Sequence, residues 1–130
     1  MQNLGGGIMG NSRPIRFRAW DESGRHYFYN YDLTAYTKED TWFKRNLYEL
    51  ILEQFTGLKD KNGVEIYEGD IVKTKFKKSK GDRLGEVVFS SGGFKVRYFD
   101  EPKSYYHMIY AEVTWEVIGN IHENKDLLND

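Results

Sequence analysis

Apolar and polar residues alternate along most of this chain with the two-residue period of a β-strand. The most ordered stretch is 54–72, where short segments rich in β-branched and aromatic residues are separated by turn residues at 60–63 and 68–70. Asn62 and Gly63 are the residue types that reach positive φ at least cost, so a chain reversal is expected there. The pattern predicts a ribbon of short strands joined by compact turns.

A hairpin is predicted on the N-terminal side of this ribbon. Residues 15–20 alternate, Asp-Glu-Ser-Gly follows as a turn, and the aromatic run at 26–31 returns as the second strand.

The segment 32–46 is ambiguous. Thr37 with Asp40 three residues later suggests a helix start, whereas alternation over 50–55 favours a strand. We expect a short helix or loop before about residue 48 and a strand after it.

A second hairpin and a closing strand are predicted on the C-terminal side. Residues 85–89 and 94–99 enclose the turn sequence Ser-Ser-Gly-Gly. A last strand is expected at 112–118, ended by Gly119-Asn120, and Asn124 is expected to cap a terminal helical turn. The residues expected to supply much of the core are Ile71, Val72, Val87, Phe89, Trp115 and Val117.

These elements predict a mainly β fold in one domain at 13–130, with a barrel-like core at about 54–121. The chain length of 130 residues suits one domain. Short antiparallel strands would form a small SH3-like barrel in the C-terminal part, with Gly69 and Gly85 at its tight bends. An N-terminal β-hairpin and a short helix or loop insertion complete the prediction. Residues 1–12 are glycine-rich and are expected to be a flexible leader.

The central ribbon also carries a family resemblance. Phe55–Val72, reading FTGLKDKNGVEIYEGDIV, resembles the signature of the YopX family of phage and prophage proteins, and 15–21 and 116–124 resemble the ends of that family. The resemblance implies a small β-rich protein with an SH3-like barrel, encoded by bacteriophages or prophages. It implies no established biochemical activity.

Composition limits the cellular setting and the partners. Nineteen Lys and Arg against twenty Asp and Glu give a formal charge of -1, so no global field attracts nucleic acid or an anionic membrane. The absence of cysteine fits a reducing compartment, and no segment has the pattern of a signal peptide or a membrane span. We therefore expect a cytoplasmic protein without a membrane partner, and the family resemblance implies that the host is bacterial.

A basic stretch at 73–83 is one candidate contact surface. Six basic residues and one acid give it a local charge of +5. Its side chains either contact phosphates or guard an edge strand against pairing, and the guard is favoured because the net charge is near zero. The candidate nucleic-acid contacts are Lys73, Lys75, Lys77, Lys78, Lys80 and Arg83.

An aromatic surface is the other candidate. The chain has 3 Trp, 10 Tyr and 8 Phe, more rings than one small core hides, so a homo-oligomer is expected. These rings either pack in the core or form an exposed surface for a partner. The acidic segment 111–130, with five acids and one lysine, complements the basic stretch and offers a further contact between copies. The candidate partner residues are Trp20, Tyr27, Tyr29, Tyr31, Tyr105 and Tyr106.

Catalytic chemistry has little support. His26, His107 and His122 are far apart in sequence and lack metal-ligand spacing, and no nucleophile-elbow or phosphate-loop motif is present. Four acids lie around the central turns and are expected to accept backbone hydrogen bonds rather than hold a cation. These acids are Asp60, Glu65, Glu68 and Asp70.

The favoured function is therefore a noncatalytic binding or assembly module with no cofactor and no metal. Its partners would be copies of itself or a phage or host protein. The alternative is a nucleic-acid-associated protein that uses the hairpin at 73–83.

Overall fold

The described part of the protein is built mainly of antiparallel strands, which confirms the predicted mainly β class. The computed structural model describes residues 14–31, 50–74, 81–98, 105–109 and 114–128, so the predictions for the leader at 1–12 and the insertion at 32–48 lie outside the described residues. The strands are β1 (Phe17–Asp21), β2 (His26–Tyr31), β3 (Leu50–Lys59), β4 (Glu65–Tyr67), β5 (Asp70–Thr74), β6 (Arg83–Ser90), β7 (Gly93–Tyr98), β8 (Tyr105–Met108) and β9 (Glu116–Asn120).

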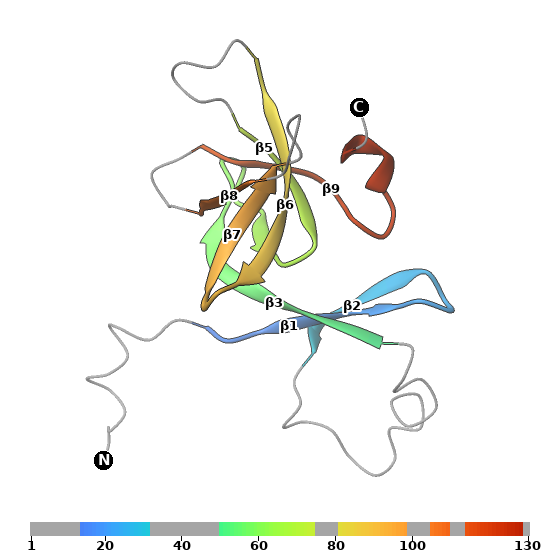
Figure 1. Cartoon of the computed structure of the whole chain (residues 1–130). Helices are drawn as coiled ribbons and strands as arrows, with labels where there is room; N and C mark the ends of the chain where they lie inside the picture. The colour runs from blue at the N-terminus through green and yellow to red at the C-terminus, as the bar shows by residue number, and fades with distance from the viewer. Residues whose placement is uncertain (1–13, 32–49, 75–80, 99–104, 110–113, 129–130) are drawn as a thin grey trace, which may run out of the picture.

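The N-terminal hairpin belongs to a four-stranded sheet with the order β2-β1-β3-β4. Its turn is held by Asp21, whose Oδ1 accepts hydrogen bonds from the backbone N–H groups of Ser23 and Gly24 at 3.1 and 3.2 Å. The first half of β3 pairs with β1, and its second half pairs with β4. This long strand therefore runs from the hairpin to the rest of the molecule, as Figure 1 shows.

The second sheet has five strands in the order β8-β7-β6-β5-β9 and curves into a half-barrel, which is consistent with a small β-barrel. The predicted second hairpin is confirmed. It closes through a two-residue turn in which Ser91 and Gly92 both have positive φ, 52° and 84°, the conformation that matches the twist of the strands. At Gly85 a Cβ atom would lie 2.5 Å from Val96 Cγ1, so a side chain there would displace the facing strand.

The core lies inside this half-barrel and contains most of the residues predicted for it. Trp115, Val72, Val87 and Ile71 are buried, and Val117 packs against the buried cluster. The prediction for Phe89 was wrong, because its side chain is 52% exposed. Phe89 lies near the end of the hairpin, beyond the buried layer, where its ring makes an edge-to-face contact with Phe94.

The C-terminal segment also departs from the prediction. Gly119 and Asn120 lie within β9 instead of ending it, and they pair with Ile71 and Asp70 of β5. A 3-10 helix, η3 (Lys125–Leu128), follows as the expected helical turn. The side chain of Asn124 accepts a hydrogen bond from the Asn120 backbone N–H at 3.1 Å rather than capping this helix.

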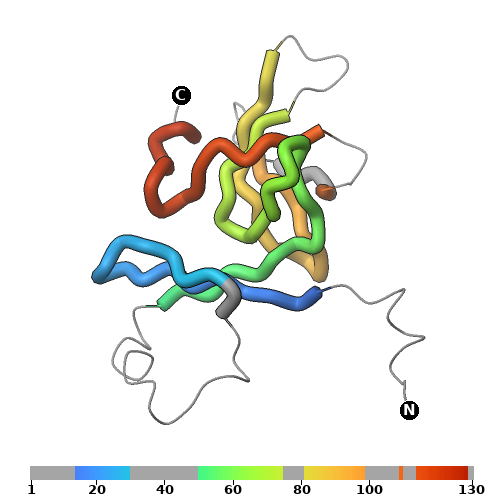
Figure 2. The backbone as a smooth tube through the Cα atoms, turned by 180° about the vertical axis from the view of Figure 1, so that it is seen from behind, coloured from blue at the N-terminus to red at the C-terminus, as the bar shows by residue number. Residues whose placement is uncertain are grey.

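The C-terminal segment closes over the N-terminal hairpin, as both overall views show (Figures 1 and 2). Arg25, at the hairpin turn, donates a hydrogen bond to the carbonyl oxygen of His122 at 2.8 Å. The two ends of the family-like region are thus neighbours in space. In the described part of the chain, no helix combines the length and the apolar character that crossing a bilayer requires.

The contrast between Trp115 and Phe89 gives a test of the core. Trp115 is 2% exposed, so Trp115→Ala should lower the free energy of unfolding by about 3–5 kcal/mol, as truncation of a large core aromatic does. Phe89→Ala should cost less than about 1 kcal/mol, because that ring is already half in water. Urea unfolding measures both, and equal losses for the two variants would contradict this core.

Candidate functional site

A buried guanidinium lies where the two sheets meet. Strand alternation places Arg18 and Trp20 on the same face of β1, directed toward the half-barrel. Arg18 Nε donates to Glu53 Oε1 of β3 at 2.8 Å, and a terminal nitrogen lies 2.9 Å from Asp70 Oδ1 at the start of β5. The same nitrogen donates to the Glu68 carbonyl oxygen at 3.0 Å. One side chain on β1 therefore joins two other segments, β3 and residues 68–70.

Aromatic rings enclose this ion pair. The Arg18 guanidinium carbon lies 4.1 Å from the ring centre of Tyr27 and 4.8 Å from that of Tyr67. Both are cation–π contacts shielded from water. The Tyr27 hydroxyl also donates to Glu53 Oε1 at 2.9 Å. Burial, the main cause, raises the pKa of Tyr27 far above its ordinary value, so this hydroxyl stays protonated and remains a donor.

The C-terminal segment joins the network through His122. Its Nε2 lies 2.7 Å from Glu53 Oε2, and its ring stacks on Trp20 with centroids 4.6 Å apart and planes 5° from parallel. Gly69 is adjacent to the same carboxylate. A Cβ atom at Gly69 would lie 2.5 Å from Glu53 Oε2, and its φ of 86° also favours glycine.

The ion pairs of Arg18 share one guanidinium between two carboxylates. Glu53 and Asp70 are two buried carboxylates, and the single guanidinium of Arg18 lies between them. Desolvation of the second carboxylate is therefore incompletely offset. Burial raises the pKa of Asp70 to about 6, although Arg18 and the Tyr67 backbone N–H, at 2.8 Å from Oδ2, both oppose the shift.

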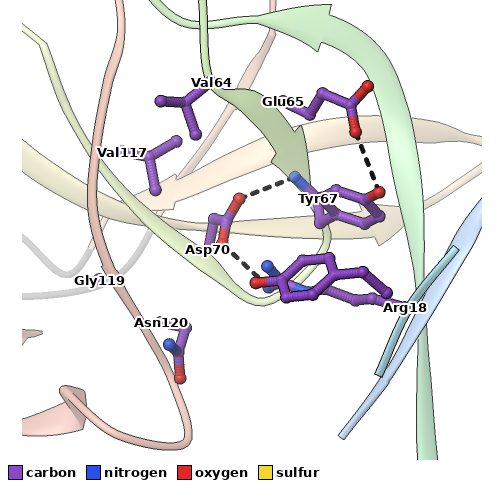
Figure 3. A pocket seen from close by; sticks show the side chains of 9 residues that line it. Arg18, Val64, Glu65, Tyr67, Asp70, Val117, Gly119 and Asn120 are labelled. Atoms are coloured by element: carbon purple, nitrogen blue, oxygen red, sulfur yellow. Dashed lines mark hydrogen bonds and ion pairs between the residues drawn. The ribbon is translucent and has the colours of Figure 1, made fainter. Parts of the chain in front are cut away.

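A cavity of about 380 Å³ opens beside this network, between β4 and β9. Figure 3 shows Arg18, Tyr67 and Asp70 together on one side of it, with Val64 and Val117 opposite. Tyr67 and Asp70 are each only 2% exposed, so they form a floor. The complete lining is Arg18, Tyr29, Val64, Glu65, Tyr67, Asp70, Val117, Gly119 and Asn120.

The accessible walls of this cavity are apolar and aromatic. Tyr29 and Val64 are 56% and 48% exposed. The Tyr29 ring contacts the Tyr67 ring edge-on, with centroids 6.0 Å apart. Glu65, on β4, pairs with Arg16 and accepts a hydrogen bond from the Tyr67 hydroxyl at 3.1 Å. The arrangement is a preformed pocket with a charged, tightly bonded floor and open hydrophobic sides.

The predicted aromatic surface is only partly present. Trp20 was wrongly placed in it, because the side chain is fully buried between the sheet and His122. Tyr27 is half-buried against Arg18, and Tyr29 is exposed at the pocket. The side chains of Tyr31, Tyr105 and Tyr106 lie outside the described residues.

The predicted basic stretch is described only at its two ends. Lys73 Nζ lies 3.4 Å from Glu116 Oε1 and 4.0 Å from Asp82 Oδ2, beside a second cavity of about 250 Å³. Its assignment as an edge guard was wrong, because β5 is paired on both sides, with β6 and β9. The guanidinium of Arg83 lies 5.0 Å from the ring centre of Tyr98. The remaining predicted contacts, Lys75, Lys77, Lys78 and Lys80, lie outside the described residues.

The acids around the central turns accept hydrogen bonds within the protein, as expected. Asp60 accepts from the backbone N–H groups of Asn62, Val64 and Val117 at 2.8–2.9 Å. Burial opposes ionisation of Asp60, but these bonds hold its pKa below the ordinary value. Glu68 Oε1 accepts from the Gln54 N–H at 2.8 Å. Among the described residues, no three side chains of metal-ligating type gather into a group.

Sequence reasoning missed the central members of the site, Arg18 and Glu53. The signal was present at 15–20, where Arg18 alternates in phase with Trp20 and therefore shares its face. A charged residue on the same strand face as a large aromatic residue is as consistent with a buried ion pair as with an exposed sheet edge. The partner, Glu53, lies 35 residues away, and its pairing depends on the register of β1 with β3.

The chain is similar to a known protein family and to solved structures. The family model described as YopX protein matches residues 16–129. The solved structure of protein EF1440 from Enterococcus faecalis is similar, with a TM-score of 0.59 and 27% sequence identity, and the match covers 90% of this chain and 99% of that chain. The solved structure of protein yopX from Bacillus subtilis is also similar, with a TM-score of 0.51 and 25% sequence identity, and the match covers 86% of this chain and 96% of that chain. No curated protein matches the chain.

Two glycines test how strongly the network depends on close backbone approach. Gly69 and Gly63 both have positive φ, 86° and 84°, but only Gly69 lacks room for a side chain. Gly63→Ala should cost about 1–2 kcal/mol from backbone strain alone. Gly69→Ala also displaces the Glu53 carboxylate from Arg18 and His122, and it should cost about 3–5 kcal/mol. Denaturant unfolding compares them, and equal costs would show that Glu53 moves aside freely.

The raised pKa of Asp70 predicts a pH dependence of stability. Because the pKa of Asp70 is raised in the folded protein from 3.8 to about 6, its contribution is fully present below about pH 4 and is lost as the pH rises through 6. Relative to Asp70→Asn, the wild type should lose up to about 3 kcal/mol of unfolding free energy between pH 4 and pH 7. Urea titrations at several pH values measure this difference.

The exposed Asp82 provides the control for this measurement. Asp82→Asn should shift stability by the same small amount at each pH. A pH-independent difference between the wild type and Asp70→Asn would contradict the raised pKa of Asp70.

Proposed function

This chain belongs to the YopX family, and on that premise we propose that it is a noncatalytic binding or assembly module of phage or prophage origin that acts in the bacterial cytoplasm. The phage origin and the compartment rest on the family resemblance and on the lack of cysteine. The binding role rests on the pocket between β4 and β9.

The observation that carries the proposal is the contrast between the floor and the walls of this pocket. At the floor, Arg18, Asp70 and Tyr67 are each bonded to protein partners and are almost inaccessible. Both oxygens of Asp70 and the hydroxyl of Tyr67 are thus already used in contacts within the protein. The walls instead present exposed apolar area at Tyr29 and Val64, which is suited to contact with another molecule.

A second copy of the chain is the first expected partner. Tyrosine is enriched at protein interfaces because it combines apolar area with a polar tip. Tyr29 and Val64 lie on one pocket and are both about half exposed, so covering them would bury apolar surface without disturbing the core. A phage or host protein is the alternative partner for the same surface.

A nucleic-acid role is the second function considered, and the described basic residues give it little support. Lys73 faces Glu116 and Asp82, which would have to be displaced or would repel a phosphate. The case therefore rests on the sequence of 75–80 alone, with its four lysines. Anisotropy with a labelled DNA or RNA at low salt addresses it, and micromolar affinity that falls steeply with salt would favour this function.

Light scattering at tens of micromolar tests the assembly module. We expect the wild type to be a dimer or higher oligomer, and Tyr29→Ala combined with Val64→Ser should weaken association at least tenfold. Phe89→Ala removes a similarly exposed apolar side chain from the β6–β7 hairpin, outside the pocket lining, and should leave association unchanged. If the wild type is monomeric, the self-assembly proposal is refuted, and a phage or host protein remains as the expected partner.

A further inference from the structure

The turn that follows β9, residues 121–124, lies over the N-terminal hairpin (Figures 1 and 2). We call these four residues the C-terminal strap. Asn120, the last residue of β9, shapes the strap, because its Oδ1 accepts hydrogen bonds from the backbone N–H groups of His122 and Glu123 at 3.0 and 2.9 Å. The Asn124 N–H donates to the Asn120 carbonyl oxygen at 2.8 Å. These bonds are local, so they fix the shape of the strap but not its position on the hairpin.

The contacts between the strap and the hairpin gather at His122. Its ring stacks on Trp20 and meets the edge of Tyr27, with centroids 4.6 and 5.9 Å away. Its Nε2 lies 2.7 Å from Glu53 Oε2, and its carbonyl oxygen accepts a hydrogen bond from Arg25 at 2.8 Å. The side chain is 9% exposed, so the hairpin and β3 enclose it. The position of the strap therefore depends on His122.

Protonation of the imidazole strengthens its contact with Glu53. The carboxylate oxygen only accepts, so Nε2 donates to Oε2 in both the neutral and the protonated ring. A proton added at Nδ1 gives the ring a positive charge, and the hydrogen bond becomes an ion pair that is shielded from water. Histidine is the side chain whose ordinary charge change falls between about pH 5 and pH 8. The strength of this contact therefore varies with pH near neutrality.

Glu53 is placed to use this second cation. Its Oε1 accepts from Arg18 and Tyr27, and its Oε2 faces His122. The guanidinium of Arg18 is shared with Asp70, so a protonated His122 supplies Glu53 with a cation that Asp70 does not share. The charged and titratable groups around His122 are Glu53 of β3, Arg18 of β1, Tyr27 of β2, Asp70 of β5, Glu22 and Arg25 of the hairpin turn and Glu123 of the strap itself.

We infer that the C-terminal strap is a pH-sensitive latch, which His122 holds on the hairpin when its ring is protonated and releases more readily when the ring is neutral. Closure and proton uptake favour each other, because opening separates the protonated ring from Glu53. The latch is tightest near about pH 5 and loosens as the pH rises toward about 8. Gly119 and Asn120 line the pocket at the base of the strap, so release affects one wall of the pocket. This inference does not depend on the proposed binding role.

Amide hydrogen exchange, followed by NMR on the full chain, measures the opening of the strap. The Ile121 backbone N–H donates to the Gly69 carbonyl oxygen at 2.8 Å, so closure protects it from exchange. After correction for the intrinsic rate, its protection factor should fall at least threefold between pH 5.5 and pH 8. At pH 8 it should also be lower than that of Val96 in β7, because the strap opens while the half-barrel stays folded. A protection factor that is constant or rises with pH would overturn the inference.

Variants separate His122 from the other groups that titrate. Burial raises the pKa of Asp70 to about 6, so Asp70→Asn removes a second titration in the same range and should keep the pH dependence at Ile121. Adding His122→Gln keeps a neutral donor for Glu53 and should abolish that dependence. His26→Gln removes an exposed histidine of the same hairpin and should leave it unchanged. Loss of the dependence with Asp70→Asn alone, or with His26→Gln, would contradict the latch.

Arg25 gives a test that leaves the buried network intact. Its side chain is 54% exposed, and it holds the carbonyl oxygen of His122 rather than the ring. Arg25→Gln should therefore lower the protection of Ile121 by a similar factor at each pH. Because this variant alters a surface side chain, it keeps the test valid if His122→Gln does not fold. A pH dependence that disappears in Arg25→Gln would assign the effect to Arg25 and refute the role of His122.

Discussion

The buried guanidinium of Arg18 is the interaction on which the arrangement of the two sheets depends. Its partners are Glu53, in the half of β3 that pairs with β1, and Asp70, the first residue of β5. Removing one partner of a buried ion pair costs far more than an exposed pair contributes, because the remaining charge is left without water. The contact therefore stabilises the packing of the hairpin against the half-barrel only when Arg18 and both carboxylates are present.

This requirement explains several otherwise unrelated choices in the chain. Gly69 has no side chain because Glu53 occupies the space beside its Cα. Trp20 is buried on the same face as Arg18, and His122 returns from the far end of the chain to stack on it and reach the second oxygen of Glu53. A matching family model that begins at residue 16 and ends at residue 129 spans all of these groups. The N-terminal and C-terminal segments are therefore parts of one interaction network and are not independent additions to a barrel.

Sequence patterns predicted the strands well because strand formation here is local. Alternation and turn residues located both hairpins, and Gly63 has the positive φ that the central turn required. The site could not be found in the same way, because Arg18 is an exposed arginine or a buried one depending on a carboxylate 35 residues away. Phe89 shows the same limit: its phase matches that of buried Val87, but distance along the hairpin places it beyond the core. The SH3-like assignment stays a prediction, while the family and the mainly β class are confirmed.

The two buried carboxylates beside Arg18 link the stability of the fold to pH at the pocket. One guanidinium lies between Glu53 and Asp70, so it offsets the burial of both carboxylates only in part. Burial raises the pKa of Asp70 to about 6, and a proton on this carboxyl relieves the repulsion between the two acids. Asp70 is also part of the pocket floor, so the same titration changes the charge that faces an occupant. Because a ligand that binds only the folded chain stabilises it by mass action, pH and occupancy of the pocket act on the same folding equilibrium.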